Sequence, residues 1–320
     1  ICVALGIASL INPGVGMNMT VSATAATEQT EKVNFADTLL NIIPKNIFTS
    51  MSDGDMLPII VFALFVGVML AKLGSKASVV ANFFGQFNDI MMEMTMAIMK
   101  VAPIGVFCMI ARTFSSIGFD AFLPMAKYML CVILALAVQC FGVYQILLFA
   151  FTRLNPIRFI KKFFPVMTFA FSTSTSNATI PLSIETLQKK IGVSRKISSF
   201  TIPLGATINM DGTSIMQGVA VIFIAQAYGI PLSAGAIGAV IATATIASIG
   251  TAGVPSVGLV TLTMVLTSAG LPTEGITLIM GIDRILDMLR TAVNITGDAV
   301  CTTIVSKQQS ALNKDIFDLD

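Results

Sequence analysis

Long apolar runs are the feature of this sequence that most limits what the chain can fold into. Two of them, Met56–Leu70 and Met129–Phe149, are long enough, or nearly so, to cross the roughly 30 Å hydrocarbon layer of a bilayer. The 320-residue chain is 55% hydrophobic and 11% charged, with a mean hydropathy of +0.87, whereas soluble domains carry about 25% charged residues. So little charge could not cover a soluble surface. We therefore predict an all-α protein that crosses a membrane several times.

Composition also narrows the chemistry. A net charge of +2 gives no reason to expect a nucleic-acid partner. The chain has no histidine, and its five cysteines are scattered without a C-x-x-C pair, so no nucleophile–base or metal constellation of an enzyme is visible. The chain starts inside an apolar helix expected to end near Asn12-Pro13-Gly14. We expect further sequence before Ile1.

The placement of basic residues predicts topology, because cytoplasmic loops are enriched in lysine and arginine. Two basic clusters flank the apolar segment Phe163–Leu187: Arg153, Arg158, Lys161 and Lys162 before it, and Lys189, Lys190, Arg195 and Lys196 after it. Both clusters stay cytoplasmic only if this segment is a re-entrant hairpin, with its polar tip at Ser172–Thr179. An ordinary kinked helix is the alternative.

A second apolar segment, Ala234–Ala269, is broken by the glycine- and proline-containing stretch Ser248–Gly258. Two such interrupted segments at corresponding places indicate a transporter binding site. Between them, Asn209 and Gly212 are poor helix formers, so we predict a broken helix at this point. Freed carbonyl oxygens beside Asp211 would suit a hard cation. The alternative is a structural aspartate that joins two helices.

The stretch Gly281–Asp298 gathers polar residues in an otherwise apolar region. At about 100° per residue, five of its side chains fall within an arc of about 80° on one helix; they are Asp283, Asp287, Arg290, Asn294 and Asp298. Thr291 borders this stripe, and Arg284 lies to one side of it. Ionisable groups in a membrane span face a cavity or a partner.

The order of these groups suits an acidic amino acid. Arg290 can hold a carboxylate at two points, Asp287 can accept a hydrogen bond from an ammonium group, and Asn294 can donate to a second carboxylate. Asp298, one turn further, is better placed for a metal ion. The alternative is an internal network, Asp287–Arg290 and Asp283–Arg290, that only holds helices together.

Three stretches carry a resemblance to a known family: Asn209–Thr213, Ser248–Pro255 and Asp287–Asp298. The chain resembles, over nearly its whole length, the dicarboxylate/amino acid:cation symporters, which include archaeal sodium–aspartate transporters and human excitatory amino acid transporters. The resemblance implies the glutamate-transporter fold: a homotrimer of eight-helix protomers, each with two opposed re-entrant helical hairpins and a transport domain that moves like an elevator.

The resemblance also implies a division of the chain. Residues 1–19 would end the third helix, in the transport domain, and residues 35–113 would form the scaffold and trimerisation helices. Residues 126–320 would complete the transport domain. Within it we expect hairpin 1 at about 160–188, the broken helix at about 198–228, hairpin 2 at about 234–269 and the last helix at about 276–305.

Site residues are implied position by position. Arg290 and Thr213 would bind the side-chain carboxylate, Asp287 the amino group, and Asn294 with Ser176 the α-carboxylate. The second hairpin tip would close as a gate. The implied substrate-binding residues are Ser176, Thr213, Gly253, Val254, Gly258, Asp287, Arg290, Thr291 and Asn294.

Cation sites are implied in the same way. One sodium site would join Asp298 to Asn294, Gly205 and Asn209, and a second would use the broken helix and the start of the second tip. A third would use Asp211 and Asn209 with residues of the third helix. The implied metal-binding residues are Gly205, Thr207, Asn209, Met210, Asp211, Ser248, Ile249, Thr251, Asn294 and Asp298.

Two positions decide the expected substrate. Members for neutral amino acids lack an equivalent of Arg290, and members for C4-dicarboxylates lack one of Asp287. Both residues are present here, so we expect L-aspartate or L-glutamate carried with sodium across a bacterial inner membrane. Proton coupling through Asp211 or Asp298, a C4-dicarboxylate substrate and an ion-conducting pore are the alternatives. Ser174 and Met288 stand where many members hold an extra arginine, and Arg284 is nearby.

Overall fold

The computed structural model describes residues 1–17, 43, 46–53, 56–101, 104–105, 107–108, 111, 115, 122–250 and 256–319. Over these ranges the chain is helical, and the only β-type pairing is an isolated bridge between Val193 and Leu312. Three helical stretches are long and apolar enough to cross a membrane: Pro58–Met91, Phe122–Thr152 and Arg195–Ala227. The all-α prediction is confirmed for the described residues.

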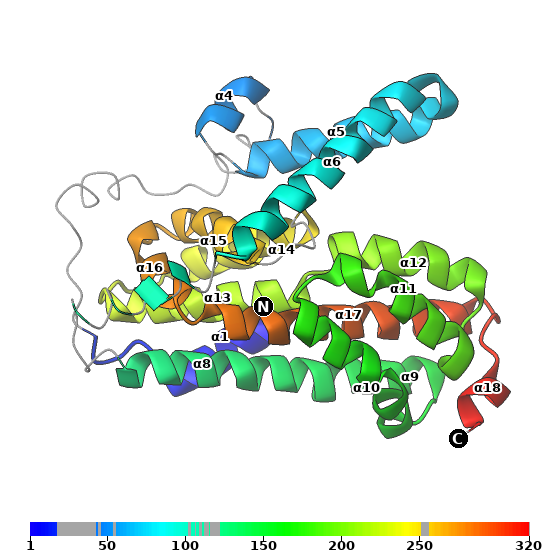
Figure 1. Cartoon of the computed structure of the whole chain (residues 1–320). Coiled ribbons are helices and arrows are strands. Elements are labelled where there is room, and N and C mark those ends of the chain that lie inside the picture. The colour runs from blue at the N-terminus through cyan, green and yellow to red at the C-terminus, as the bar shows by residue number, and fades with distance from the viewer. Residues whose placement is uncertain are drawn as a thin grey trace.

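A long continuous helix frames one side of the bundle (Figure 1). It runs through α8 (Phe122–Ala137), the π-helical segment η3 (Val138–Val143) and α9 (Tyr144–Thr152) without a break. The N-terminal helix α1 (Cys2–Ile11) packs against α8 and α13 (Asp211–Ala227). It ends at Asn12, whose φ of 52° is left-handed, so the predicted end of this helix is confirmed.

The segment between the two basic clusters forms a pair of packed helices, α10 (Pro156–Thr173) and α11 (Ser176–Thr186). The chain turns between them at Ser174, with φ of 53°, and at the extended residue Thr175. A short π-helix, η4 (Leu187–Ile191), follows α11. Lys161 of α10 and Lys190 of η4 line one hollow. Helix α11 therefore folds back along α10, and the two basic clusters lie at the same end of this helix pair.

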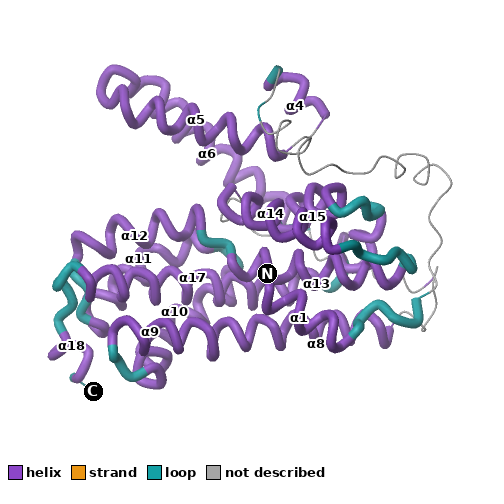
Figure 2. Tube along the Cα trace, turned by 180° about the vertical axis from the view of Figure 1, so that it is seen from behind, coloured by secondary structure: helices purple, strands orange, loops and turns teal. Residues whose placement is uncertain are grey.

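The predicted helix break is confirmed. Helix α12 (Arg195–Ile208) ends and α13 begins on either side of Asn209 and Met210, which have non-helical backbone angles. Every residue of α13 is buried except Asp211 and Gln226, which are half-buried. A helix apolar nearly all round belongs in the centre of a bundle, and α13 lies there beside α1 and α17 (Figure 2).

The second interrupted segment contains α14 (Ala234–Gly250) and α15 (Val257–Ser268), which pack side by side. Residues 251–255 lie outside the described residues. After the short η5 (Thr273–Gly275), the expected last helix is divided into α16 (Ile276–Met280) and α17 (Asp283–Gln308). Gly281 is a weak helix former, and Asp283 suits the first turn of a new helix because of the helix dipole.

Helix α17 is the axis of the site because it packs against α8, α9, α10, α12 and α13. The chain closes with α18 (Lys314–Asp318). A separate arm of α4 (Ile47–Asp53), α5 (Met56–Leu73), the 3-10 turn η1 (Gly74–Ala77) and α6 (Ser78–Met99) projects from the bundle (Figure 1). Its large apolar side chains, such as Phe65 and Val79, are exposed. Such a surface needs lipid or a protein partner.

Candidate functional site

The polar stripe of α17 faces the interior of the bundle, as predicted. Its five members are all buried, with exposed fractions of 2% for Asp283, 7% for Asp287, 1% for Arg290, 3% for Asn294 and 4% for Asp298. Since Asp283 and Asp298 are 15 positions apart, the stripe follows about four turns of the helix. Charged groups removed from water in this way must be paired.

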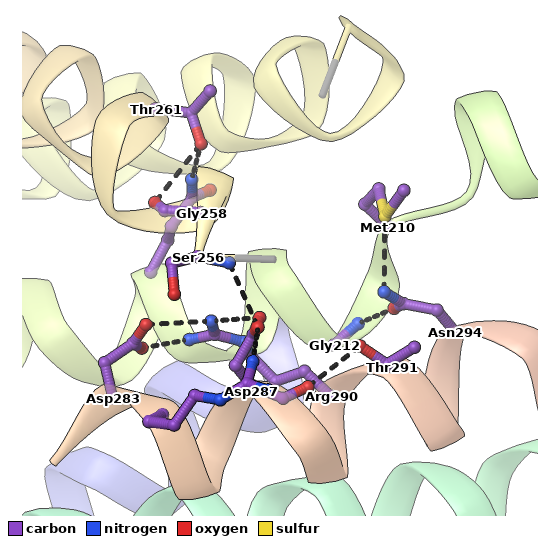
Figure 3. A network of polar contacts seen from close by, with 12 residues as sticks. Met210, Gly212, Ser256, Gly258, Thr261, Asp283, Asp287, Arg290, Thr291 and Asn294 are labelled. Carbon is purple, nitrogen blue, oxygen red and sulfur yellow. Dashed lines mark hydrogen bonds and ion pairs between the residues drawn. The ribbon is translucent and has the colours of Figure 1, made fainter. Parts of the chain in front are cut away.

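Arg290 is paired with two carboxylates at once (Figure 3). Its Nη1 lies 2.5 Å from Asp283 Oδ1, and its Nη2 lies 3.2 Å from Asp283 Oδ2 and 2.8 Å from Asp287 Oδ1. The buried Nε has no hydrogen-bond partner within the described chain. The ion pairs considered from sequence as a purely structural alternative therefore both form, and the Nε donor of the guanidinium remains for another acceptor.

The start of α15 covers this ion-pair cluster. The backbone N–H of Ser256 donates to Asp287 Oδ2 at 3.0 Å. A β-carbon added to Gly258 would lie 2.9 Å from Thr213 Cγ2 and 3.6 Å from Arg290 Nη2. The absence of a side chain at Gly258 thus lets α15 approach α13 and α17 closely. Thr213, Gly258, Asp287 and Arg290, predicted to share one site, are brought together.

Asn294 joins α17 to the broken helix. Its Oδ1 accepts the backbone N–H of Gly212 at 2.7 Å, and its Nδ2 donates to the sulfur of Met210 at 3.2 Å. A thioether is a weak acceptor, so a carboxylate oxygen would be a better partner for this amide. Thr291, also buried, bonds the carbonyl of Asp287 at 2.9 Å.

A second polar cluster lies around Asp298. Asn209 Nδ2 donates to Asp298 Oδ1 at 2.8 Å and to the carbonyl of Asn294 at 3.3 Å. A β-carbon on Gly205 would lie only 2.5 Å from Asp298 Oδ1, so the glycine lets the α12 backbone and this carboxylate meet. The four residues predicted for the first sodium site, Gly205, Asn209, Asn294 and Asp298, are therefore neighbours. Each has a carbonyl or carboxylate oxygen that could face a cation.

Asp211 belongs to a third polar group, which contains a residue that the sequence did not single out. Tyr144 on α9 donates its hydroxyl to Asp211 Oδ2 at 2.7 Å. Asp211 also lines a cavity of about 250 Å³ with Gln139, Ser214 and the predicted ligand Ser248. Tyr144 sits in an apolar run with no motif around it, so only the tertiary fold identifies it.

Other predicted site residues are less closely assembled. Ser176 is buried at the start of α11, and its carbonyl accepts from Thr179. Thr207 and Ile249 are exposed, and Thr207 bonds the carbonyl of Pro203. Thr251, Gly253 and Val254 lie outside the described residues. Over the residues that are described, no group of three or more acidic or cysteine side chains could hold a metal ion.

Arg284, which the sequence placed near the site, lies beside Asp287. Its Nη1 lies 3.7 Å from Asp287 Oδ2, and its side chain is about one-third exposed. Ser256, meanwhile, was missed as a site residue because its contribution is a backbone N–H, which no side-chain pattern encodes. The carboxylate of Asp287 therefore contacts two cations and one amide.

Comparison with known proteins agrees with this geometry. A family model described as "Sodium:dicarboxylate symporter family" matches residues 1–308. A proton/sodium-glutamate symport protein of Bacillus caldotenax is 37% identical, over 98% of this chain and 76% of the relative. Excitatory amino acid transporter 3 of Mus musculus is 41% identical, over 80% of this chain and 49% of the relative.

The relatives differ in the substrates that their names record. A neutral amino acid transporter B(0) of Oryctolagus cuniculus is 35% identical, over 92% of this chain and 61% of its own length. Similarity to these relatives therefore does not identify the substrate, which must be inferred from the residues of the site. The helical architecture, the buried acid–arginine stripe and the match over residues 1–308 lead to one conclusion: the chain belongs to the sodium:dicarboxylate symporter family, whose members are membrane transporters and not enzymes.

Proposed function

We propose that this protein is a secondary active symporter that carries L-aspartate or L-glutamate together with sodium. The observation that carries the proposal is the buried guanidinium of Arg290, held between Asp283 and Asp287 under the start of α15. A buried arginine with a donor to spare can recognise a carboxylate, and an adjacent carboxylate can recognise an ammonium group. A neutral amino acid also presents both groups, and an acidic one adds a second carboxylate, for which Asn294 Nδ2 is the available donor.

Each substrate group has a protein partner in this proposal. The side-chain carboxylate binds Arg290 and lies beside Thr213, and the ammonium group binds Asp287. The α-carboxylate replaces the sulfur of Met210 as acceptor for Asn294 Nδ2, with Ser176 on its other side. Because succinate would bring a second negative charge beside Asp287 with no ammonium group to offset it, succinate is disfavoured.

Charge balance gives a physical reason for cation coupling. The buried stripe holds Asp283, Asp287 and Asp298 against Arg290, and an acidic amino acid adds another net negative charge. Burying uncompensated anions is costly. A cation bound by Asp298, Asn209 and the Gly205 carbonyl would offset that cost, so substrate and cation should each strengthen binding of the other.

The family description names sodium, and the names of the bacterial relatives add a second candidate for the coupled cation. The bacterial relatives are named proton/sodium-glutamate symport proteins, so proton coupling at Asp211 or Asp298 is the runner-up. The neighbourhood of Asp211, Ser214 and Ser248 around one cavity supports a further cation position. Thr207, Met210, Ile249 and Thr251 would form a separate cation site with the backbone of Ser248, after movement of the second hairpin.

The proposed mechanism is alternating access of the elevator type. The pairs α10–α11 and α14–α15 would enter the membrane from opposite faces as re-entrant hairpins, and the tip containing Gly253 and Val254 would close over the substrate. The α5–α6 arm would belong to a scaffold that forms a homotrimer, since its apolar surface is exposed. We place the protein in a bacterial inner membrane on the basis of its bacterial relatives.

Ligand-dependent thermal stabilisation tests the function directly. The purified transporter would be heated with L-aspartate, L-glutamate, L-serine or succinate, each in sodium and in choline at one pH. A ligand that binds the folded state raises the midpoint by mass action. We expect a rise with the two acidic amino acids in sodium alone. An equal rise in choline would favour proton coupling, and a rise with succinate or serine alone would refute the substrate assignment.

A further inference from the structure

A basic hollow lies outside the transport site, at the end of the bundle where α10 begins. It has a volume of about 750 Å³ and opens between α10, η4 and the C-terminal helix α18. Five of its lining side chains are cationic: Arg158, Lys161, Lys162, Lys189 and Lys190. The other described residues that line it, Asn155, Ile157, Ile316 and Leu319, carry no acidic side chain. So dense a set of like charges is unfavourable unless an anion offsets it.

Protein groups offset only part of this charge. Arg158 pairs with Asp318 at 3.1 Å, and Lys189 pairs with Glu185 at 2.8 Å. Lys161 and Lys190 are exposed and form neither of these ion pairs. The hydrogen bond from Lys189, and after it the nearby charge of Lys190, lower the pKa of the Glu185 carboxyl. The N-terminal end of α10, whose dipole also favours anions, borders the same hollow. The hollow therefore retains a positive charge that suits a phosphate group.

The C-terminal wall of the hollow is held in place. Lys162 Nζ donates to the carbonyls of Phe317 at 2.9 Å and Leu319 at 2.5 Å, and it lies 5.5 Å from the Phe317 ring centroid. Phe317 itself is buried, and the bridge between Val193 and Leu312 anchors the preceding residues. A fixed wall spares a ligand the cost of ordering it.

An apolar groove begins one residue away from the basic hollow. Its volume is about 430 Å³, and its lining includes Phe141, Ile146, Phe149 and Pro156. Pro156 stands between Asn155 and Ile157, both of which line the basic hollow. The side chains of Phe141, Ile146 and Phe149 are exposed on the outside of the bundle, where lipid chains would contact a membrane protein.

We propose that this hollow and groove together bind an anionic phospholipid. Its phosphate group would lie between Lys161 and Lys190, and one acyl chain would follow the groove along α9. The two basic clusters predict that this end faces the cytoplasm, where anionic lipids attract basic surfaces. The occupant is a lipid and not a soluble phosphate because an apolar groove begins at Pro156, next in the chain to Asn155 and Ile157 of the basic hollow.

Native mass spectrometry of the purified transporter tests the proposal with phosphatidylglycerol and phosphatidylcholine as probes. We expect phosphatidylglycerol to bind more tightly, and the double variant Lys161→Gln/Lys190→Gln to weaken it roughly 30-fold, at about fivefold per lost charge. The matched control, Lys196→Gln/Lys314→Gln, removes two exposed lysines that do not line the hollow. Equal phosphatidylglycerol binding in both double variants would overturn the proposal.

A groove variant distinguishes a lipid from a soluble phosphate. Ile146→Asn should weaken phosphatidylglycerol binding while leaving the affinity for glycerol 1-phosphate unchanged. If glycerol 1-phosphate instead competes at the same concentration as the intact lipid, and Ile146→Asn has no effect, the hollow binds soluble phosphates and the lipid assignment is wrong. Thermal midpoints within about 2 °C of the parent protein would establish that each variant is folded.

Discussion

Arg290 and Asp283 form a two-point ion pair across two turns of one helix. The Nη1–Oδ1 distance is 2.5 Å and the Nη2–Oδ2 distance is 3.2 Å, and both side chains are almost completely buried. Residues seven apart share a helix face, so the pair is built into α17 itself. In this arrangement Asp283 occupies donors that a substrate carboxylate would need. Under the proposed function, a substrate carboxylate would exchange with Asp283 for these donors.

Replacing Arg290 should separate charge from geometry. Arg290→Lys keeps a cation but loses the fork that reaches two acids and a substrate, so we expect acidic amino acids to bind roughly 10- to 150-fold more weakly with a modest fall in thermal midpoint. Arg290→Met leaves Asp283 and Asp287 without a cation and should cost about 3–5 kcal/mol of stability. Isothermal titration and thermal unfolding in sodium measure the two effects.

The control for this pair is Arg284→Lys, because Arg284 contacts Asp287 at 3.7 Å from a partly exposed position. It should change affinity less than threefold, in keeping with the small contribution of exposed ion pairs. If Arg290→Lys bound substrate as tightly as the parent protein does, the guanidinium would have only a structural role.

Asp287 should determine whether the substrate needs an amino group. Asp287→Asn removes the acceptor charge for the ammonium but keeps an oxygen for the Ser256 N–H. We expect L-aspartate to bind at least tenfold more weakly, while succinate binds equally well or better, because a repelling carboxylate is gone. Competition between the two ligands in a thermal-shift titration gives the ratio.

Asp283→Asn provides the comparison for that ratio. Asp283 pairs with the same arginine but has no role in binding the ammonium group. It should therefore alter both affinities in parallel and leave the ratio of aspartate to succinate nearly unchanged. Equal loss of discrimination in the two variants would mean that the network as a whole, and not Asp287, reads the amino group.

The sequence predicted the parts of the site that a single helix or local propensity determines. The stripe from Asp283 to Asp298 follows from helical periodicity, because residues three, four and seven apart share a face. The break at Asn209 follows from poor helix formers in an apolar run. Both are local properties, and both are confirmed.

Contacts between distant segments could not be read in this way. The hydroxyl of Tyr144 meets Asp211 across 67 positions, and the N–H of Ser256 meets Asp287 across 31. The first depends on how the continuous helix α8–η3–α9 packs against α13, and the second on a backbone group that every residue except proline possesses. The π-helical segment at Val138–Val143 likewise carries no signal of its own, since its residues resemble those of the flanking helices.

Tyr144→Phe tests whether Asp211 has a cation partner. Removing the hydroxyl leaves Asp211 Oδ2 without its donor and should cost about 1–3 kcal/mol in the absence of a replacement. If a cation binds near Asp211, sodium should supply part of the lost interaction. We therefore expect a larger fall in thermal midpoint in choline than in sodium.

Tyr128→Phe is the matched control, because the buried hydroxyl of Tyr128 has no hydrogen-bond partner among the described residues. Its removal should be neutral or slightly stabilising in both salts. An identical fall for Tyr144→Phe in sodium and in choline would contradict a cation position at Asp211 and would favour a purely structural bond.

Gly205→Ala tests the cation cluster at Asp298 without changing any charge. The added methyl group would lie 2.5 Å from Asp298 Oδ1 and 2.7 Å from its Cγ, closer than van der Waals contact allows, so the carboxylate must turn away from Asn209. Helix α12 tolerates alanine at this position by propensity. We expect the sodium concentration that gives half-maximal stabilisation by L-aspartate to rise at least tenfold.

Gly238→Ala on α14 is the control, because the added methyl group meets no atom within 4 Å and should leave that sodium concentration unchanged. If the two glycine variants respond to sodium alike, Asp298 and the Gly205 carbonyl do not bind the coupled cation, and the coupling site must be sought around Asp211.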